Sequence, residues 1–151
     1  MKSSVVDVFR RMCSLREYCT FDLLKKMERM GLDEGEKQSV INTLKEEKFL
    51  DDVRFAGAFV RDKSRLGGWG TLKIRYALRN KKIQDEIISD ALSEISANSE
   101  NERLNKILSL KAKSIKSDIS FENRLNRLVR FAVSRGYSYE LSIKVAKEII
   151  G

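Results

Sequence analysis

The chain has 151 residues, of which 42% are hydrophobic and 34% charged, and it contains 8 glycines and no proline. Proline breaks helices and β-rich folds need many turn residues, so this composition favours long helices over sandwiches and barrels. The formal net charge of +8 suits a polyanionic partner such as nucleic acid, although a basic protein that is merely soluble would have the same balance.

The sequence does not indicate membrane insertion or metal binding. No segment approaches the ~20 apolar residues of a membrane span, and the start of the chain lacks the apolar stretch of a signal peptide. Cys13 and Cys19 are the only cysteines, and no histidine accompanies them to complete a zinc site. We therefore expect a cytoplasmic chain that holds no metal and no cofactor.

An apolar pattern occurs three times along the chain, and its copies lie 51 and 54 residues apart. The spacings within each half of a copy put the side chains on one face of a helix. Each copy therefore predicts a helix, a tight turn and a second helix. The three copies consist of Leu23, Met27, Leu32, Val40, Ile41 and Leu44; of Ile74, Leu78, Ile83, Ala91, Leu92 and Ile95; and of Leu128, Ala132, Tyr137, Val145, Ala146 and Ile149.

The first predicted unit spans residues 1–50. A helix over residues 5–12 precedes the two helices of the apolar pattern. Gly31 stands where the second helix must end, and glycine tolerates the left-handed turn found there. Asp33 and Glu36 have the spacing of a capping box, which predicts the start of the third helix.

The second predicted unit spans residues 51–97. Its first helix is expected over residues 52–63, with Asp51 and Asp52 as candidate N-caps. The glycine-rich stretch at residues 67–70 is typical of a connection between helices.

The third predicted unit spans residues 98–151, with a first helix from 101 to about 113. Residues 114–120 form the connection, Gly136 ends the middle helix, and Ser138 caps the last one. A single unit has a small core, and stacking of the units would bury the faces between neighbours. We expect an all-α chain of about nine helices without a sheet.

Positive charge is concentrated in two tracts, at residues 61–82 and 103–135. The first tract has eight basic residues and one acidic residue, and the second has nine basic and two acidic ones. A basic arc on one helix is more often an ordinary solvated face, but two such tracts in successive units favour a binding surface for phosphates.

The distribution of charge argues against a helix-turn-helix that reads DNA bases. In that motif the last helix of the unit enters the major groove. Here residues 85–95 carry four acidic residues and no basic one, and the last helices of the other two units have net charges of −1 and zero. An acidic helix would be repelled by the phosphates of the groove, and none of the three last helices carries the positive charge that the motif needs.

The sequence contains no phosphate-binding glycine motif and no pairing of a nucleophile with a base, so we do not expect an enzyme. The backbone around Gly68 and Gly70 has the composition to hold an anion, but a turn that packs Trp69 against the core is the stronger interpretation. Asp51 and Asp52 lack further nearby ligands for a metal, and helix capping explains them.

Four segments together resemble the RecX family. They are Leu50-Asp51-Asp52-Val53-Arg54-Phe55-Ala56-Gly57-Ala58-Phe59-Val60; the basic linker through Gly70 with Lys73-Ile74-Arg75 and Leu78; Leu15-Arg16-Glu17-Tyr18 leading into Leu23-Leu24-Lys25-Lys26-Met27; and Phe131-Ala132 with Arg135-Gly136-Tyr137. The order and spacing of these pieces carry the resemblance, which extends from about residue 10 to 150. Cys19, often serine in that family, and Lys82, commonly glycine, are departures that affect local turns.

The resemblance implies three tandem three-helix repeats stacked into an elongated, curved right-handed array. It also implies a monomer that binds the RecA nucleoprotein filament and restrains strand exchange, ATP hydrolysis and co-protease activity in DNA repair and the SOS response. Binding to bare single- or double-stranded DNA would be weak and independent of sequence.

The basic tracts supply the candidate contacts with the filament or with DNA. These candidates are Arg54, Arg61, Lys63, Arg65, Lys73, Arg75, Arg79, Lys81, Lys82, Lys111, Lys113, Arg124, Arg127, Arg130 and Arg135. Two alternatives remain open: a general nucleic-acid-binding module that is independent of RecA, and a helical scaffold for a different acidic protein.

Overall fold

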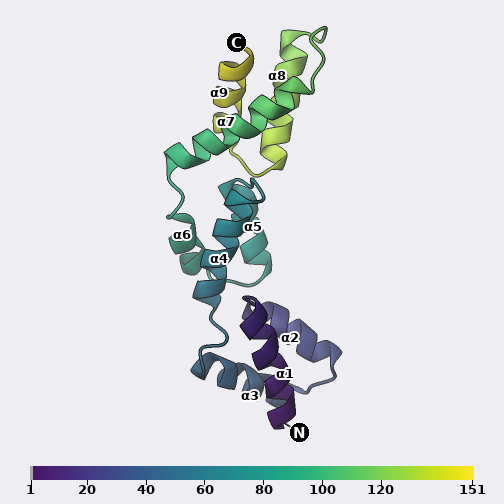
Figure 1. Cartoon of the computed structure of the whole chain (residues 1–151), viewed down its shortest axis with the longest axis vertical. Helices are drawn as coiled ribbons and strands as arrows, with labels where there is room; N and C mark the ends of the chain where they lie inside the picture. Colours follow the sequence, from purple (N-terminus) through teal and green to yellow (C-terminus); the bar gives the residue numbers. More distant parts are fainter. Residues whose placement is uncertain (1) are drawn as a thin grey trace.

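A computed structural model describes residues 2–151, with side chains from Ser4 onward. Within this range the chain forms nine helices and no strand, which confirms the predicted all-α fold (Figure 1). The helices are α1 (Lys2–Leu15), α2 (Thr20–Arg29), α3 (Glu34–Glu46), α4 (Asp52–Arg65), α5 (Thr71–Asn80), α6 (Asp85–Leu92), α7 (Ala97–Lys113), α8 (Phe121–Ser134) and α9 (Tyr139–Ile150). No helix in the described part of the chain is both long and apolar enough to cross a membrane.

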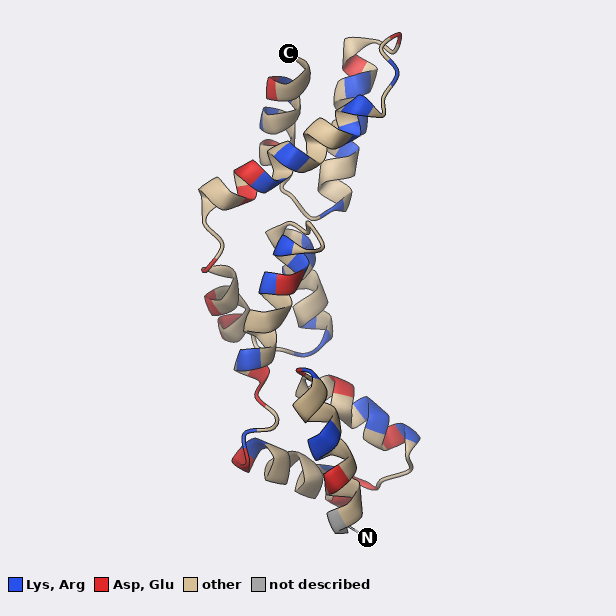
Figure 2. Ribbon diagram, viewed as in Figure 1, with Lys and Arg blue, Asp and Glu red and all other residues tan. Residues whose placement is uncertain are grey.

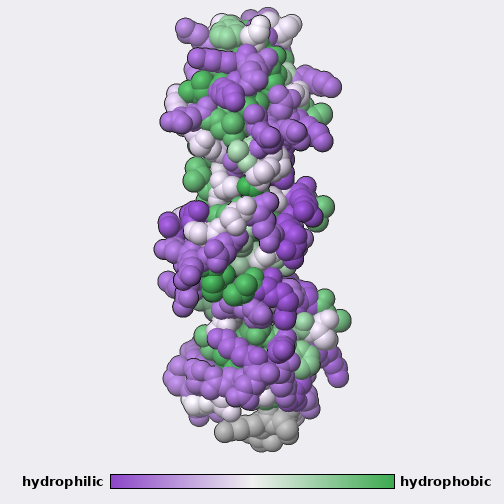
Figure 3. All heavy atoms as spheres, turned by 90° about the vertical axis from the view of Figure 1, so that its left-hand side faces the viewer, coloured by the Kyte–Doolittle hydropathy of each residue, from purple (hydrophilic) through white to green (hydrophobic). Residues whose placement is uncertain are grey.

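The helices form three groups in a row, so the body is elongated (Figure 1). We call α1–α3, α4–α6 and α7–α9 the first, second and third groups. Extensive packing of helix against helix occurs within each group, and each group is built around its own cluster of buried side chains. Hydrophilic side chains cover most of the long face in Figure 3, where hydrophobic side chains form small separate patches.

The recurring apolar positions form the cores of the groups. In each copy of the pattern five of the six side chains are buried, and the remaining ones, Leu32, Ile95 and Ile149, are partly buried. The pattern identified the core-facing sides of the second and third helices of each group because helical spacing places these side chains on one face.

The three expected turns have the same backbone conformation. Gly31, Lys82 and Gly136 have φ angles of 81°, 60° and 98°, so all three lie in the left-handed region that ends a helix. Lys82 adopts this conformation without being glycine. Two predicted N-termini are also confirmed: α3 begins with a capping box, and Ser138 caps α9.

Helix α7 begins four residues before its predicted start. The side chain of Ser96 accepts a hydrogen bond from the backbone N–H of Ser99, which allows the helix to start at Ala97. Residues 97–100 are mostly polar and small, so they contribute no apolar period that would have revealed this turn.

Asp51 caps α4 as predicted, but Asp52 has a different partner. Asp52 Oδ1 accepts hydrogen bonds from the backbone N–H and the hydroxyl of Thr20, at 2.8 and 3.1 Å. Thr20 is the first residue of α2, whose N-cap, Cys19, makes no side-chain capping bond. A carboxylate of the second group therefore caps a helix of the first group, and Cys19 itself is buried in the core of the second group.

The junction between the second and third groups repeats this arrangement. Gly70, the N-cap of α5, has no side chain to offer, and Glu100 Oε2 of α7 accepts from the N–H of Thr71 at 3.1 Å. The junction is closed by two backbone bonds: Gly70 N–H donates to the carbonyl of Arg135 at 2.7 Å, and Leu72 N–H donates to that of Gly136 at 3.0 Å.

The backbones at the second junction lie very close together. A Cβ atom added to Gly70 would lie 2.3 Å from the carbonyl oxygen of Gly136, and one added to Gly136 would lie 2.3 Å from Cβ of Lys73. Both positions therefore require glycine. The hydroxyl of the buried Tyr137 adds a further bond, since it donates to the carbonyl of Gly68 at 3.0 Å.

We predict that Asp52→Ala lowers the free energy of unfolding by about 1 kcal/mol, the usual loss when an N-cap acceptor is removed. Asp52→Asn should lose less, because the amide oxygen still accepts a hydrogen bond. Urea unfolding measures both, and Asp62→Ala, at an exposed position of the same helix, is the matched control. Losses for Asp52→Ala no larger than those of the control would show that the cap does not hold the junction.

We also predict that Tyr137→Phe lowers the free energy of unfolding by about 1 kcal/mol, because the carbonyl of Gly68 loses its donor. Burial raises the pKa of Tyr137 above its ordinary value of 10.0, and the neighbouring Arg103 opposes this rise. The folded state thus favours the neutral phenol, whose stabilising effect is complete below about pH 10 and is lost as the pH rises through the raised pKa.

The difference in stability between the wild type and Tyr137→Phe should therefore be constant near neutral pH and shrink in alkali. Tyr139→Phe, at an exposed tyrosine, should change nothing at any pH. A Tyr137→Phe variant as stable as the wild type at neutral pH would contradict the assigned hydrogen bond.

Candidate basic interface

The structure sorts the predicted basic residues by what their side chains contact, and two of them bridge the first and second groups. Arg54 Nε lies 2.6 Å from Glu17 Oε2, and the same guanidinium donates to the backbone carbonyls of Lys48 and Phe49. Lys81 Nζ lies 2.8 Å from Asp22 Oδ2 in a partly buried pair. These two cations neutralise carboxylates at the first junction, so their charge is not free for an outside ligand.

Three arginines of the second group make exposed contacts with α6 or with the residues just after it. Arg79 Nε lies 3.0 Å from Asp85 Oδ1, and Arg61 Nη1 lies 3.9 Å from Glu94 Oε2. Arg75 donates to the hydroxyl of Ser89 at 3.3 Å. Exposed pairs of this kind contribute little to stability, so an incoming phosphate can compete for these guanidinium groups.

Two lysines lie over the ring of Trp69. The Nζ atoms of Lys63 and Lys73 are 4.9 and 4.4 Å from the ring centroid, and Phe59 packs edge-on against the same ring at 6.2 Å. Trp69 is partly buried against the core of the second group. It therefore packs on the core, as the stronger interpretation of the sequence had it, with two lysine ammonium groups over its ring.

Helix α8 carries exposed arginines whose charge is not neutralised by an acidic side chain of the described residues. Arg127 and Arg130 are exposed and make no ion pair among the described residues. Figure 2 shows basic residues along this helix, with acidic residues confined to its first turn. Arg124, on the same helix, is partly buried, and its Nε has no hydrogen-bond partner among the residues that the structure describes. Arg65, Lys82 and Lys113 are likewise exposed and unpaired in the described part of the chain.

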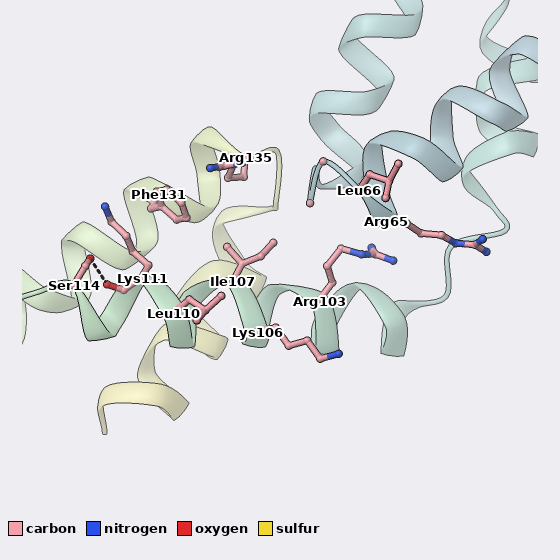
Figure 4. Close-up of a pocket in the computed structure, with 12 residues that line it drawn as sticks. Arg65, Leu66, Arg103, Lys106, Ile107, Leu110, Lys111, Ser114, Phe131 and Arg135 are labelled. Carbon is pink, nitrogen blue, oxygen red and sulfur yellow. Dashed lines mark hydrogen bonds between the residues drawn. The ribbon is translucent and has the colours of Figure 1, made fainter. Parts of the chain in front are cut away.

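A groove lies where the second group meets the third. Its volume is about 580 Å³, and its walls come from the end of α4, the following turn, α7 and α8 (Figure 4). The residues that line it are Arg65, Leu66, Gly67, Gly68, Arg103, Lys106, Ile107, Leu110, Lys111, Ser114, Phe131 and Arg135. Five of them are basic and none is acidic. We call this feature the basic groove.

The basic groove brings together predicted and unpredicted residues. Arg65, Lys111 and Arg135 were candidates from the sequence, and the cations of Lys111 and Arg135 each lie 4.9 Å from the ring centroid of Phe131. Arg103 and Lys106 belong to the second basic tract but were not selected as candidates.

A signal for the missed residues was present in the sequence. Along α7, the residues that line the groove recur at intervals of one, three and four, so basic and apolar side chains share one face of this helix. The contribution of Leu66 could not be found this way, because the turn after α4 meets α7 only through the tertiary fold.

Among the residues from Ser4 onward, no group of three or more acidic, cysteine or histidine side chains is placed to hold a metal ion. Burial raises the pKa of Cys19 to about 11, which keeps its thiol protonated, and it also raises the pKa of Cys13. The basic groove itself offers attraction of anions by arginine and lysine, together with apolar contact.

Comparison with known proteins places this architecture in a family. The family model for the second three-helix domain of RecX matches residues 51–92, which contain α4–α6. The chain is 36% identical over 126 residues to the regulatory protein RecX of Clostridium botulinum strain Eklund 17B. This alignment covers 83% of this chain and 58% of that protein. It is 28% identical over 138 residues to the regulatory protein RecX of Prosthecochloris aestuarii. This second alignment covers 90% of this chain and 87% of that protein.

Solved structures have the same fold. The crystal structure of RecX from Lactobacillus salivarius superposes with a TM-score of 0.85 at 22% identity, over 98% of this chain and 96% of that one. A crystal structure of another regulatory protein RecX gives a TM-score of 0.86 at 20% identity, over 97% of this chain and 73% of that one. The chain spans just under three fifths of the length of the clostridial relatives. Sequence, domain model and fold agree, and the chain belongs to the RecX family.

Proposed function

We propose that this chain is a regulatory protein that binds the RecA–single-stranded DNA filament and mainly inhibits RecA in DNA repair and the SOS response. Its relatives bear the name of regulatory protein RecX, which supports a regulatory role. The observation that carries the proposal is the unpaired positive charge on one elongated body: the exposed arginines of α8 and the basic groove.

The shape and the charge suit a long, regular, anionic partner. An elongated body contacts successive subunits of a filament, whereas a compact one of the same mass contacts fewer. Exposed arginines that face away from the core attract phosphates at long range and release counterions on binding. We propose residues 1–50, 51–97 and 98–151 as the three repeats that contact the filament in turn; Met1 lies outside the described residues.

The alternative is a general nucleic-acid-binding module that acts without RecA. The free guanidinium groups of Arg127 and Arg130 would serve this role equally well. It requires an affinity for bare DNA that falls with salt by roughly 0.7 to 0.9 log units per phosphate contact for each log unit of salt. Weak binding to bare DNA together with tight binding to the filament would exclude it.

RecA's DNA-dependent ATP hydrolysis, measured with increasing amounts of the full chain, tests the proposal directly. We expect the wild type to reduce hydrolysis. We predict that the double variant Arg127→Glu/Arg130→Glu needs roughly tenfold more protein for the same effect, a loss equivalent to about 1.4 kcal/mol of binding. The two side chains are exposed and unpaired, so circular dichroism should show an unchanged fold.

The matched control is Lys144→Glu/Lys147→Glu on α9. These lysines are also exposed and three residues apart, so the double variant has the same net charge change in the same group of helices. Equal losses in the two variants would mean that only total charge matters, and the assignment of the contact to α8 would be wrong. A wild type without any effect on RecA would refute the proposed function.

A further inference from the structure

The basic groove combines two properties that a phosphate site does not need together. Five cations surround it, and Leu66 and Leu110, which are 87% and 68% exposed, lie in its lining. Neither leucine belongs to a core cluster among the described residues. Exposed leucines beside a row of cations offer apolar area that only a ligand with its own apolar side chains can cover.

The apolar part of the groove is unsuited to stacking of nucleic-acid bases. Proteins that bind single strands stack bases on open aromatic rings. The ring of Phe131 is already contacted by Lys111 and Arg135. The largely exposed apolar side chains of the groove, Leu66 and Leu110, are aliphatic. Aliphatic side chains instead pack against the side chains of a peptide.

Arg103 contributes a guanidinium to the lining of the groove, and this group also lies beside the side chain of Tyr137. Its Nη1 has no hydrogen-bond partner among the described residues. An unsatisfied donor on a charged group is costly, and a carboxylate is the acceptor that matches a guanidinium best, because it accepts two parallel N–H bonds. With Arg65, Lys106, Lys111 and Arg135 around the same groove, the position favours a ligand that carries several carboxylates.

We propose that the basic groove binds an acidic peptide segment with large aliphatic side chains, supplied by a protein partner. The carboxylates pair with Arg103 and Lys106, and the aliphatic side chains cover Leu66 and Leu110. This inference rests on the proposed function only in so far as that function supplies the partner. It divides the surface into two parts, with the arginines of α8 for phosphates and the groove for protein.

Fluorescence anisotropy with labelled probes tests the proposal on the full chain, without RecA. The first probe is a short peptide of Asp, Glu and Leu; the second has Ser in place of every Leu and the same charge; the third is a single-stranded oligonucleotide. We expect the leucine peptide to bind roughly tenfold more tightly than the serine peptide, because only the former covers the exposed leucines. Equal affinity of the two peptides would overturn the proposal.

Variants locate the binding. Leu66→Gln/Leu110→Gln should abolish the preference for the leucine peptide and leave the affinity for the oligonucleotide unchanged. Leu15→Gln, at a leucine of α1 that is 80% exposed, is the control and should change neither. All three leucines are largely exposed, so these variants keep the fold. If the double variant weakens the oligonucleotide and not the peptide, the groove is a nucleic-acid site and the proposal is wrong.

The two proposals fail separately. Peptide binding at the groove without any effect on RecA hydrolysis would refute the proposed function and support the groove. Inhibition of RecA by a chain that does not distinguish the two peptides would refute the groove and support the function.

Discussion

Hydrogen bonds donated by helix N-termini to carboxylates of the next group join the three helix groups to one another. The first N–H groups of a helix have no partner within it, and Cys19 and Gly70 do not supply one. Asp52 and Glu100 do so from the following group. The middle helices of the first and second groups, α2 and α5, are thus completed only when the next group is in place. In the third group, Ser120 of α8 supplies the cap itself.

The two junctions share this cap but differ in the remaining chemistry. At the first, Arg54 pairs with Glu17 and Lys81 pairs with Asp22. The charges of these two cations of the second group are therefore neutralised within the chain. At the second, neutral backbone groups make the bonds, and Arg135 contributes only its carbonyl. Its guanidinium, like the other cations of the basic groove, therefore stays available. The second junction, across which the described residues form no ion pair, is thus the one lined by five basic residues.

Local patterns predicted the fold, and contacts between groups decided the rest. The apolar spacing identified the core, because a buried helix face requires it whatever its neighbours are. The same spacing says nothing about which charged residues meet. Arg54 and Lys81 had the same sequence features as Arg127 and Arg130, yet their carboxylates lie 37 and 59 residues away. The basic groove could not be predicted from the sequence either, because Leu66, in the turn after α4, comes to line the same groove as α7 only through the tertiary fold.

This construction also constrains how the chain can meet a large partner. Most helix packing lies within the groups, so the relative positions of neighbours depend on fewer contacts: the polar ones at each junction and, at the first, the packing of Cys19 and Phe21 on the core of the second group. Ion pairs at the first junction weaken with salt, whereas the backbone bonds and close-packed glycines at the second are insensitive to it. Added salt therefore weakens both the ion pairs between the first and second groups and the attraction of phosphates to α8. The second and third groups, with the basic groove between them, form the part of the array whose geometry does not depend on ionic conditions, and a site that distinguishes peptide side chains requires such a fixed geometry.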